Sequence, residues 1–262
     1  MLGAIAGDII GSPYEWNNIK TKDFELFDPS SLKLGFTDDS VLTVALMDAI
    51  INNKPYGPTM QHYFRKYPDA GYGSNFYSWC ANKEVDPYGS WGNGSAMRTS
   101  PVAYAFDTID DVVKRAAHYA SVTHNDPEGV KGAQAIASAI FLARTGFSKD
   151  DIANFIVEQF DYDLDRSLEE IRPDYEFDVS CQGSVPEAII SFLESEDYED
   201  AIRNAISIGG DSDTIACMAG GIAEAYYGGV PKEIASAAMG YLTKELLDVV
   251  LSFYKSYNLS YH

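Results

Sequence analysis

Two short acidic motifs, far apart in the chain, have almost the same composition. Residues 37–40 read Thr-Asp-Asp-Ser and residues 210–214 read Gly-Asp-Ser-Asp-Thr, each where a loop leads into an apolar helical segment. With no Cys or His beside them, their carboxylate and hydroxyl oxygens are the hard ligands that Mg²⁺, Mn²⁺ and Ca²⁺ prefer. If the motifs meet in space, cations are needed to offset the repulsion between like charges. The sequence therefore indicates a metal-dependent hydrolase with two acidic half-sites.

Helix capping is the alternative explanation for each motif taken alone. Thr37 is a good N-cap residue, and aspartates in a first turn are stabilised by the helix dipole by about 0.3–1 kcal/mol each. The turn at Gly209-Gly210 offers the same explanation for the second motif. Two acidic residues per motif are more than capping requires, yet the residues alone leave both explanations open.

Three further positions are candidates because of their neighbours. Glu15 follows Pro13, which ends the preceding helix, and glycines in that helix allow close backbone approach. The turn Gly92–Arg98 has N–H groups that can cradle an anion before a short helical stretch. His124 lies between two predicted helices. Each candidate also has an ordinary structural explanation. Glu15 can be a solvated carboxylate in a loop, the turn can be an ordinary turn without a ligand, and His124 can be a helix cap or a surface residue.

Helical periodicity dominates the segments that must position these residues. The stripe from Val41 to Ile50 predicts a helix after Thr37, and Asn125–Glu128 is a helix start before an Ala- and Ile-rich segment. No stretch alternates with period two, so no sheet is expected. Further helices are predicted at 110–121, 150–160, 185–194, 198–208, 213–227, 232–238 and 243–257, with long loops at 12–35, 71–94 and 161–180. We therefore expect one compact all-α domain over residues 1–262.

Charge and composition restrict the function classes. The 262 residues carry a net charge of −20, which disfavours nonspecific nucleic-acid binding and docking on an anionic membrane. A phosphorylated substrate would need cations and backbone N–H groups to approach such a surface. The three cysteines form no CxxC pair, so neither a zinc site nor a disulfide framework is expected. With no signal-peptide pattern and no long apolar run, we expect a soluble, cytoplasmic protein.

Taken together, the order of motifs resembles the ADP-ribosylglycohydrolase family, which includes the dinitrogenase reductase-activating glycohydrolases. The resemblance covers almost the whole chain. The motifs that carry it are Gly3–Asp8 with Tyr14-Glu15, Phe36–Ser40, Gly92–Arg98, Thr123-His124 with Gly132-Ala133, and Gly209–Ala216. The family's fold is a compact, orthogonal multi-helix all-α fold, and its members cleave ADP-ribose from protein side chains.

The resemblance also implies roles for individual residues. It implies two Mg²⁺ or Mn²⁺ ions, bound on one side by Thr37, Asp38 and Asp39 and on the other by Asp211, Asp213 and Thr214. Glu15, Asp38 and Asp39 are the catalytic candidates, since they would orient or deprotonate the attacking water at C1″. Substrate contacts are expected from Gly92, Asn93, Gly94, Ser95 and His124, and from Gly183 and Ser184 at the adenosine end.

The acceptor side chain is not fixed by any motif. We expect ADP-ribosylated protein or ADP-ribose as the partner, with arginine as the favoured acceptor because the chain is short for the family and acidic. Serine O-glycosides and small ADP-ribosyl esters are the alternatives within the family. A non-catalytic, crystallin-like or ADP-ribose-binding relative and a Mg²⁺-dependent phosphohydrolase are the rivals outside that activity.

Overall fold

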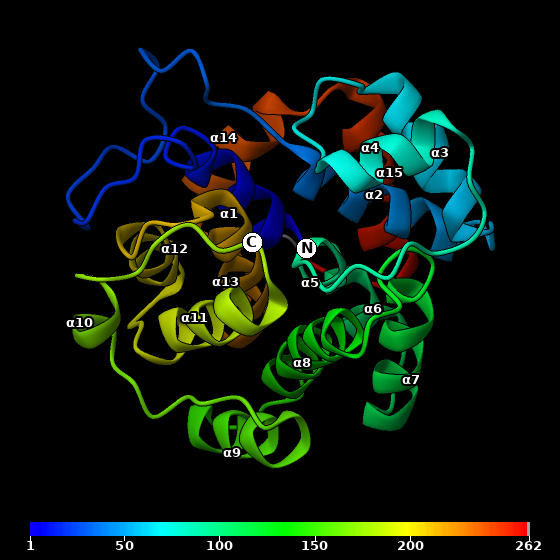
Figure 1. Cartoon of the computed structure of the whole chain (residues 1–262). Helices are drawn as coiled ribbons and strands as arrows, with labels where there is room; N and C mark the ends of the chain where they lie inside the picture. The colour runs from blue at the N-terminus through cyan, green and yellow to red at the C-terminus, as the bar shows by residue number, and fades with distance from the viewer. Residues whose placement is uncertain (261–262) are drawn as a thin grey trace.

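Two helices from distant parts of the chain lie side by side in the middle of the molecule. The computed structural model describes residues 1–260 and places α1 (Leu2–Gly11) against α13 (Ser212–Tyr227), as Figure 1 shows. Every residue of α1 is buried, and α13 is buried from Ser212 to Glu224. Helices α8 (Pro127–Arg144), α11 (Cys181–Leu193) and α12 (Tyr198–Ser207) pack around α13. The central pair therefore carries much of the core.

Glycines set the spacing between α1 and α13. Gly3, Gly7 and Gly11 recur every four residues and so lie on one face of α1. A Cβ atom on Gly7 would lie 2.1 Å from the Ala216 carbonyl oxygen, and one on Gly11 would lie 2.5 Å from the Asp213 Cα. Only glycine allows this approach, which brings the first turn of α13 beside Asp8.

The all-α prediction is confirmed, because the described residues contain helices and no strand, apart from one isolated bridge between Gly92 and Ser180. Buried apolar side chains form one cluster that extends from α1 into the last helix. The remaining helices are α2 (Asp38–Ile51), α3 (Tyr56–Lys66), α4 (Ser74–Ala81), α5 (Gly94–Met97), α6 (Ser100–Ala105), α7 (Ile109–Ala120), α9 (Lys149–Phe160), α10 (Leu168–Ile171), α14 (Lys232–Tyr241) and α15 (Lys244–Ser256).

Most helix boundaries lie close to the predicted ones, and the differences have local causes. Helix α11 begins at Cys181, ahead of the predicted start at 185, because the Ser180 side chain accepts from the Gly183 N–H and caps an earlier turn. Helices α3 and α4 were not predicted. Most of their aromatic residues are buried, but α3 has Gly57-Pro58 in its first turn and α4 is only eight residues long. No helix among the described residues is long and apolar enough to cross a membrane.

The close approach of α1 and α13 predicts opposite effects for two alanine substitutions. Gly7→Ala should destabilise the protein by about 3 kcal/mol, because its methyl group overlaps the α13 backbone. Gly240→Ala is the matched control, since a Cβ there meets nothing within 4 Å in the exposed last turn of α14. It should stabilise the protein by roughly 0.5–1 kcal/mol. Urea unfolding measures both, and similar effects at the two positions would contradict the packing described.

Candidate metal centre and substrate cavity

Asp8 is a site residue that the sequence analysis did not identify. It is fully buried in α1, and its carboxylate accepts hydrogen bonds from the first turn of α2. Thr37 donates from Oγ1 at 2.7 Å and from its backbone N–H at 3.0 Å, and Ser40 donates from its N–H at 3.1 Å and from its hydroxyl. Asp8 thereby holds the N-terminus of α2 against α1.

Asp39 enters the same space from α2. Thr37 caps this helix by accepting from the Asp39 N–H, which fixes the first turn. The Oδ2 atom of Asp39 accepts from the Thr214 hydroxyl at 3.2 Å, so the two acidic motifs meet directly. The Oδ1 atom of Asp39 is buried and has no hydrogen-bond partner among the described residues.

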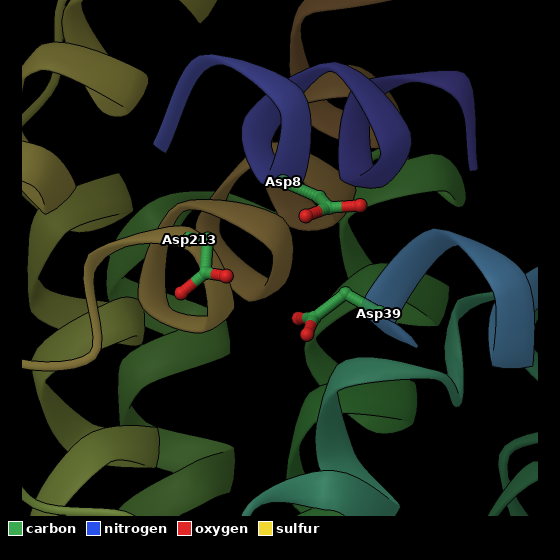
Figure 2. A group of neighbouring side chains, drawn as sticks. All are labelled: Asp8, Asp39 and Asp213. Atoms are coloured by element: carbon green, nitrogen blue, oxygen red, sulfur yellow. The ribbon is translucent and has the colours of Figure 1, made fainter. Parts of the chain in front are cut away.

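Three carboxylates from three helices converge here. Figure 2 shows Asp8, Asp39 and Asp213 pointing toward one another from α1, α2 and α13. One oxygen atom from each lies within 4.8 Å of the other two, and Glu15, Asp211 and Asp213 form a second group that meets the same criterion. Asp213 belongs to both groups, so they are adjacent. This arrangement suits two neighbouring cations that share one ligand.

Burial and mutual repulsion disfavour the charged form of these groups. Burial raises the pKa of Asp8 to about 6, although the hydrogen bonds from α2 oppose the rise. The pKa values of Asp39 and Asp213 are raised well above their usual range, first by burial and then by neighbouring carboxylates. Burial and neighbouring carboxylates also raise the pKa of Asp38, which lines the cavity but belongs to neither group. Nearby positive charge is therefore required to keep the cluster ionised at neutral pH.

Two buried carboxylate oxygens without hydrogen-bond partners show whether the residues of this cluster fit a cation. Asp39 Oδ1 and Asp213 Oδ1 are both buried without a hydrogen-bond partner among the described residues. A buried carboxylate oxygen left unpaired is costly, and most such atoms in folded proteins have a partner. The donor set is entirely oxygen, which matches Mg²⁺ or Mn²⁺. The residues present therefore fit a hard divalent cation.

Glu15 lies beside the second group on the loop that follows α1. Burial raises its pKa to about 7, and the charge of Asp211 adds to the shift. Asn18 ties this loop to α13, because its Nδ2 donates to the Gly210 carbonyl and its Oδ1 accepts from the Gly210 N–H, both at 2.9 Å. Gly209 and Gly210 have φ values of 75° and 70°, which favour glycine at this turn. The turn thus positions both Glu15 and the start of α13.

The acidic cluster forms part of the wall of a cavity of about 480 Å³. Asn93 lines it and donates from Nδ2 to Asp211 at 2.7 Å, which connects the Gly92–Ser95 turn to the metal site. Gly92 and Gly94 also line the cavity, and the Gly94 N–H has no acceptor among the described residues. All six predicted metal ligands, Thr37, Asp38, Asp39, Asp211, Asp213 and Thr214, face this cavity, as does Glu15.

His124 and Arg98 form a hydrogen-bonded pair through Thr123 at the wall of the same cavity. The Arg98 Nη2 donates to Thr123 Oγ1 at 2.7 Å, and that oxygen lies 2.8 Å from His124 Nδ1. Burial lowers the pKa of His124 well below its usual value, and the charge of Arg98 adds to the shift. The Nε2 atom of His124 is the ring nitrogen that lies beside Gly94.

Arg98 is a second residue that the sequence analysis quoted without a role. It is 1% exposed, and its Nη1 has no hydrogen-bond partner among the described residues. Among the described residues that line the cavity, it alone carries a permanent positive charge. A buried guanidinium without a carboxylate partner favours an anion nearby.

Three predicted substrate contacts lie outside the cavity lining. Ser95 directs its hydroxyl to the Gly129 carbonyl at 2.6 Å. Ser184 is buried in α11 and donates to the Ser180 carbonyl at 2.6 Å, and a Cβ on Gly183 would meet Asp178 at 2.0 Å. Their side-chain positions are thus used for local packing and capping. From the same region, Phe177 and Val179 line the cavity instead.

Comparisons with known proteins agree with this arrangement. A family model described as ADP-ribosylglycohydrolase matches residues 1–260. ADP-ribosylhydrolase ARH3 of Homo sapiens is 28% identical over 94% of this chain and 90% of the relative. ADP-ribosylarginine hydrolase Tri1 of Pseudomonas putida (strain GB-1) is 25% identical over 89% and 71%. A solved structure titled ADP-ribosylglycohydrolase-related protein complex has the same fold, with a TM-score of 0.72 and 21% identity over 97% of this chain and 96% of that one.

The converging carboxylates predict that divalent cations stabilise the protein. Mg²⁺ or Mn²⁺ at about 100 times its Kd should add about 2.7 kcal/mol to the free energy of unfolding, and EDTA should remove this gain. Asp213→Asn should abolish the response, because Asp213 belongs to both carboxylate groups. In EDTA the variant should be no less stable than the wild type, since one of several like charges is gone.

Thermal unfolding with and without metal measures this response. Glu158→Gln, exposed on α9, is the control and should keep the full response to metal. An unchanged metal response in Asp213→Asn would contradict the site.

The lowered pKa of His124 predicts a pH dependence of stability. Below the unfolded-state value of about 6.5, the unfolded chain binds a proton that the folded protein does not, so stability falls with decreasing pH. Relative to His124→Asn, the wild type should lose roughly 1 kcal/mol between pH 7.5 and 5.5. Urea unfolding across this range measures the difference, and a His124→Asn variant whose stability tracked that of the wild type would refute the assignment.

Proposed function

This chain belongs to the ADP-ribosylglycohydrolase family, and we propose that it removes ADP-ribose from arginine side chains of modified proteins by hydrolysing the C1″ glycosidic bond. Family membership makes it a glycosidase acting on ADP-ribose. One observation carries the proposal. Asp8, Asp39 and Asp213 converge from three helices, and two of them hold an unpartnered buried oxygen at the wall of a cavity of about 480 Å³.

The proposed centre holds two Mg²⁺ or Mn²⁺ ions. Asp8, Asp39 and Asp213 would hold one, and Asp211 and Asp213 would hold the other, with the Glu15 carboxylate beside it. Thr37, Asp38 and Thr214 complete the oxygen-rich wall. When bound, the cations supply positive charge that offsets the carboxylates and polarises substrate oxygen atoms.

Glu15 is the residue best suited to move a proton. Its carboxylate lines the cavity beside Asp211 and Asp213, where it can accept a proton from a water. As the bond between C1″ and the guanidine nitrogen breaks, the electron pair stays on nitrogen and C1″ gains oxocarbenium character. Glu15 would accept a proton from the attacking water while the water oxygen bonds to C1″. The guanidine nitrogen takes up a proton, so the products are free ADP-ribose and an unmodified arginine.

A neighbouring part of the cavity wall has groups that suit a diphosphate. The Gly94 N–H is a donor without an acceptor among the described residues, the His124 Nε2 atom lies beside it, and Arg98 adds a buried positive charge. Such donors bind phosphate oxygens well. This arrangement allows an anionic substrate to enter a protein whose net charge is −20.

Two observations favour arginine as the acceptor. Acidic residues dominate the protein, and an acidic cavity mouth attracts a guanidinium-bearing substrate. The relative Tri1 is named an ADP-ribosylarginine hydrolase. A serine O-glycoside is the second candidate, because the ARH3 relatives, which have somewhat higher identity than Tri1, are named ADP-ribosylhydrolases with no stated acceptor. The cytoplasmic location stays a prediction.

Release of free ADP-ribose from arginine- and serine-linked ADP-ribosylated peptides tests the proposal. We expect Mg²⁺- or Mn²⁺-dependent release from the arginine-linked peptide and its loss in EDTA. Asp213→Asn should lower kcat by about 10²–10⁴-fold, the range typical for loss of an essential catalytic group. Glu158→Gln, which is exposed on α9 and does not line the cavity, should keep wild-type turnover.

Each alternative gives a different result. Release from the serine-linked peptide alone would assign the serine O-glycoside, and release from neither would reject both linkages. Release of inorganic phosphate would indicate a phosphohydrolase.

A further inference from the structure

Two aromatic side chains from distant loops stack at the mouth of the cavity. Trp16 follows Glu15, and Phe177 lies in the loop between α10 and α11. Their ring centroids are 4.9 Å apart with an interplanar angle of 24°, and both residues line the cavity. Trp16 is 69% exposed and Phe177 is 41% exposed. These two residues, here called the aromatic pair, leave large ring surfaces open to solvent beside the site.

The aromatic pair lies at the reacting end of the cavity. Trp16 is bonded to Glu15 along the chain, and the Glu15 carboxylate groups with Asp211 and Asp213. Trp91, which is 50% exposed, lines the cavity next to Gly92 in the turn that carries the free Gly94 N–H. The leaving group departs near Glu15, the residue that precedes Trp16 of the aromatic pair.

The loops that carry the pair are held in place. Asn18 bonds the Trp16 loop to Gly210, and the Tyr175 hydroxyl donates to the Gly183 carbonyl at 2.6 Å beneath Phe177. Lys20 donates to the Tyr175 carbonyl at 2.7 Å, which connects the two loops to each other. The stacked geometry is therefore built into the fold, and the ammonium of Lys20 is already occupied by carbonyl oxygens.

The charges around the pair are mainly negative. Glu176 and Asp178 flank Phe177 in the sequence, and Glu15 and Asp211 lie behind Trp16. An exposed aromatic face attracts a cation within about 6 Å of the ring centroid, and a guanidinium also stacks flat on such rings. An acidic surround adds long-range attraction for the same group.

We propose that the aromatic pair is the acceptor subsite, in which Trp16 and Phe177 hold the guanidinium of the ADP-ribosylated arginine against Glu15. This inference rests on the arginine linkage proposed above and adds the residues that select it. A serine acceptor brings no cation to the pair. The pair therefore discriminates between linkages, while the ADP-ribose portion binds elsewhere in the cavity.

Steady-state kinetics of Trp16 variants on matched peptides test the subsite. The substrates are two peptides of otherwise identical sequence, one with ADP-ribosyl-arginine and one with ADP-ribosyl-serine. Trp16→Ala should lower kcat/KM for the arginine-linked peptide by about 3- to 30-fold, mainly through KM. Trp16→Phe keeps an aromatic face and should retain most of the wild-type value. Phe177→Ala should resemble Trp16→Ala.

Two measurements separate this role from a general one. Calorimetric Kd values for free ADP-ribose should stay within about twofold of wild type in the Trp16 and Phe177 variants. Trp91→Ala, an exposed tryptophan on the same cavity, is the matched control, and any effect it has should fall equally on the two peptides. A thermal melt of each variant confirms that an exposed substitution has left the fold intact.

The outcomes distinguish this inference from the proposed function. The first case is a wild type that cleaves the arginine-linked peptide. If Trp16→Ala then leaves kcat/KM for this peptide unchanged, or weakens turnover of both peptides and ADP-ribose binding equally, the acceptor subsite is rejected and the proposed function stands. If the wild type does not cleave the arginine-linked peptide, the acceptor assignment and the subsite are both rejected. Selective loss of the arginine-linked reaction with unchanged ADP-ribose binding supports both.

Discussion

The contact between α1 and α13 is the constraint on which the site depends. Glycines on one face of α1 let the two backbones touch, so Asp8 reaches the first turn of α13, where Asp213 lies. Asp8 then binds the N-terminus of α2 through Thr37 and Ser40, which brings Asp39 into the same space. One tight helix pair therefore determines where three carboxylates from distant parts of the sequence meet.

Without positive charge nearby, the three converging carboxylates destabilise the folded protein. Buried like charges raise each other's pKa, as Asp39 and Asp213 illustrate, and two carboxylate oxygens remain without partners. The packing energy of a large apolar core must hold these groups together in the metal-free chain. Stability and function are thus opposed at this site, as is common where catalytic groups are buried. Cations that bind the folded state would relieve this opposition.

Periodicity predicted the helices well and the contacts between them poorly. The stripe after Thr37 and the proline at 127 mark α2 and α8 because these signals are local. Asp8 was missed as a member of the carboxylate cluster, although a carboxylate inside an otherwise apolar helix flanked by glycines is a signal that could have found it. Trp16 and Phe177 come from two long loops without periodicity. Their stacking depends on tertiary bonds such as that of Asn18, which no local pattern encodes.

The placement of Arg98 has a consequence for how a substrate is oriented. The cavity wall has carboxylates near α13 and a buried guanidinium beside His124, so negative and positive charges lie in different parts of it. A ligand with an anionic middle and a cationic end has one low-energy direction in such a field, and its reversed pose places like charges together. The charges on the cavity wall therefore select the orientation of the incoming molecule before any individual contact forms.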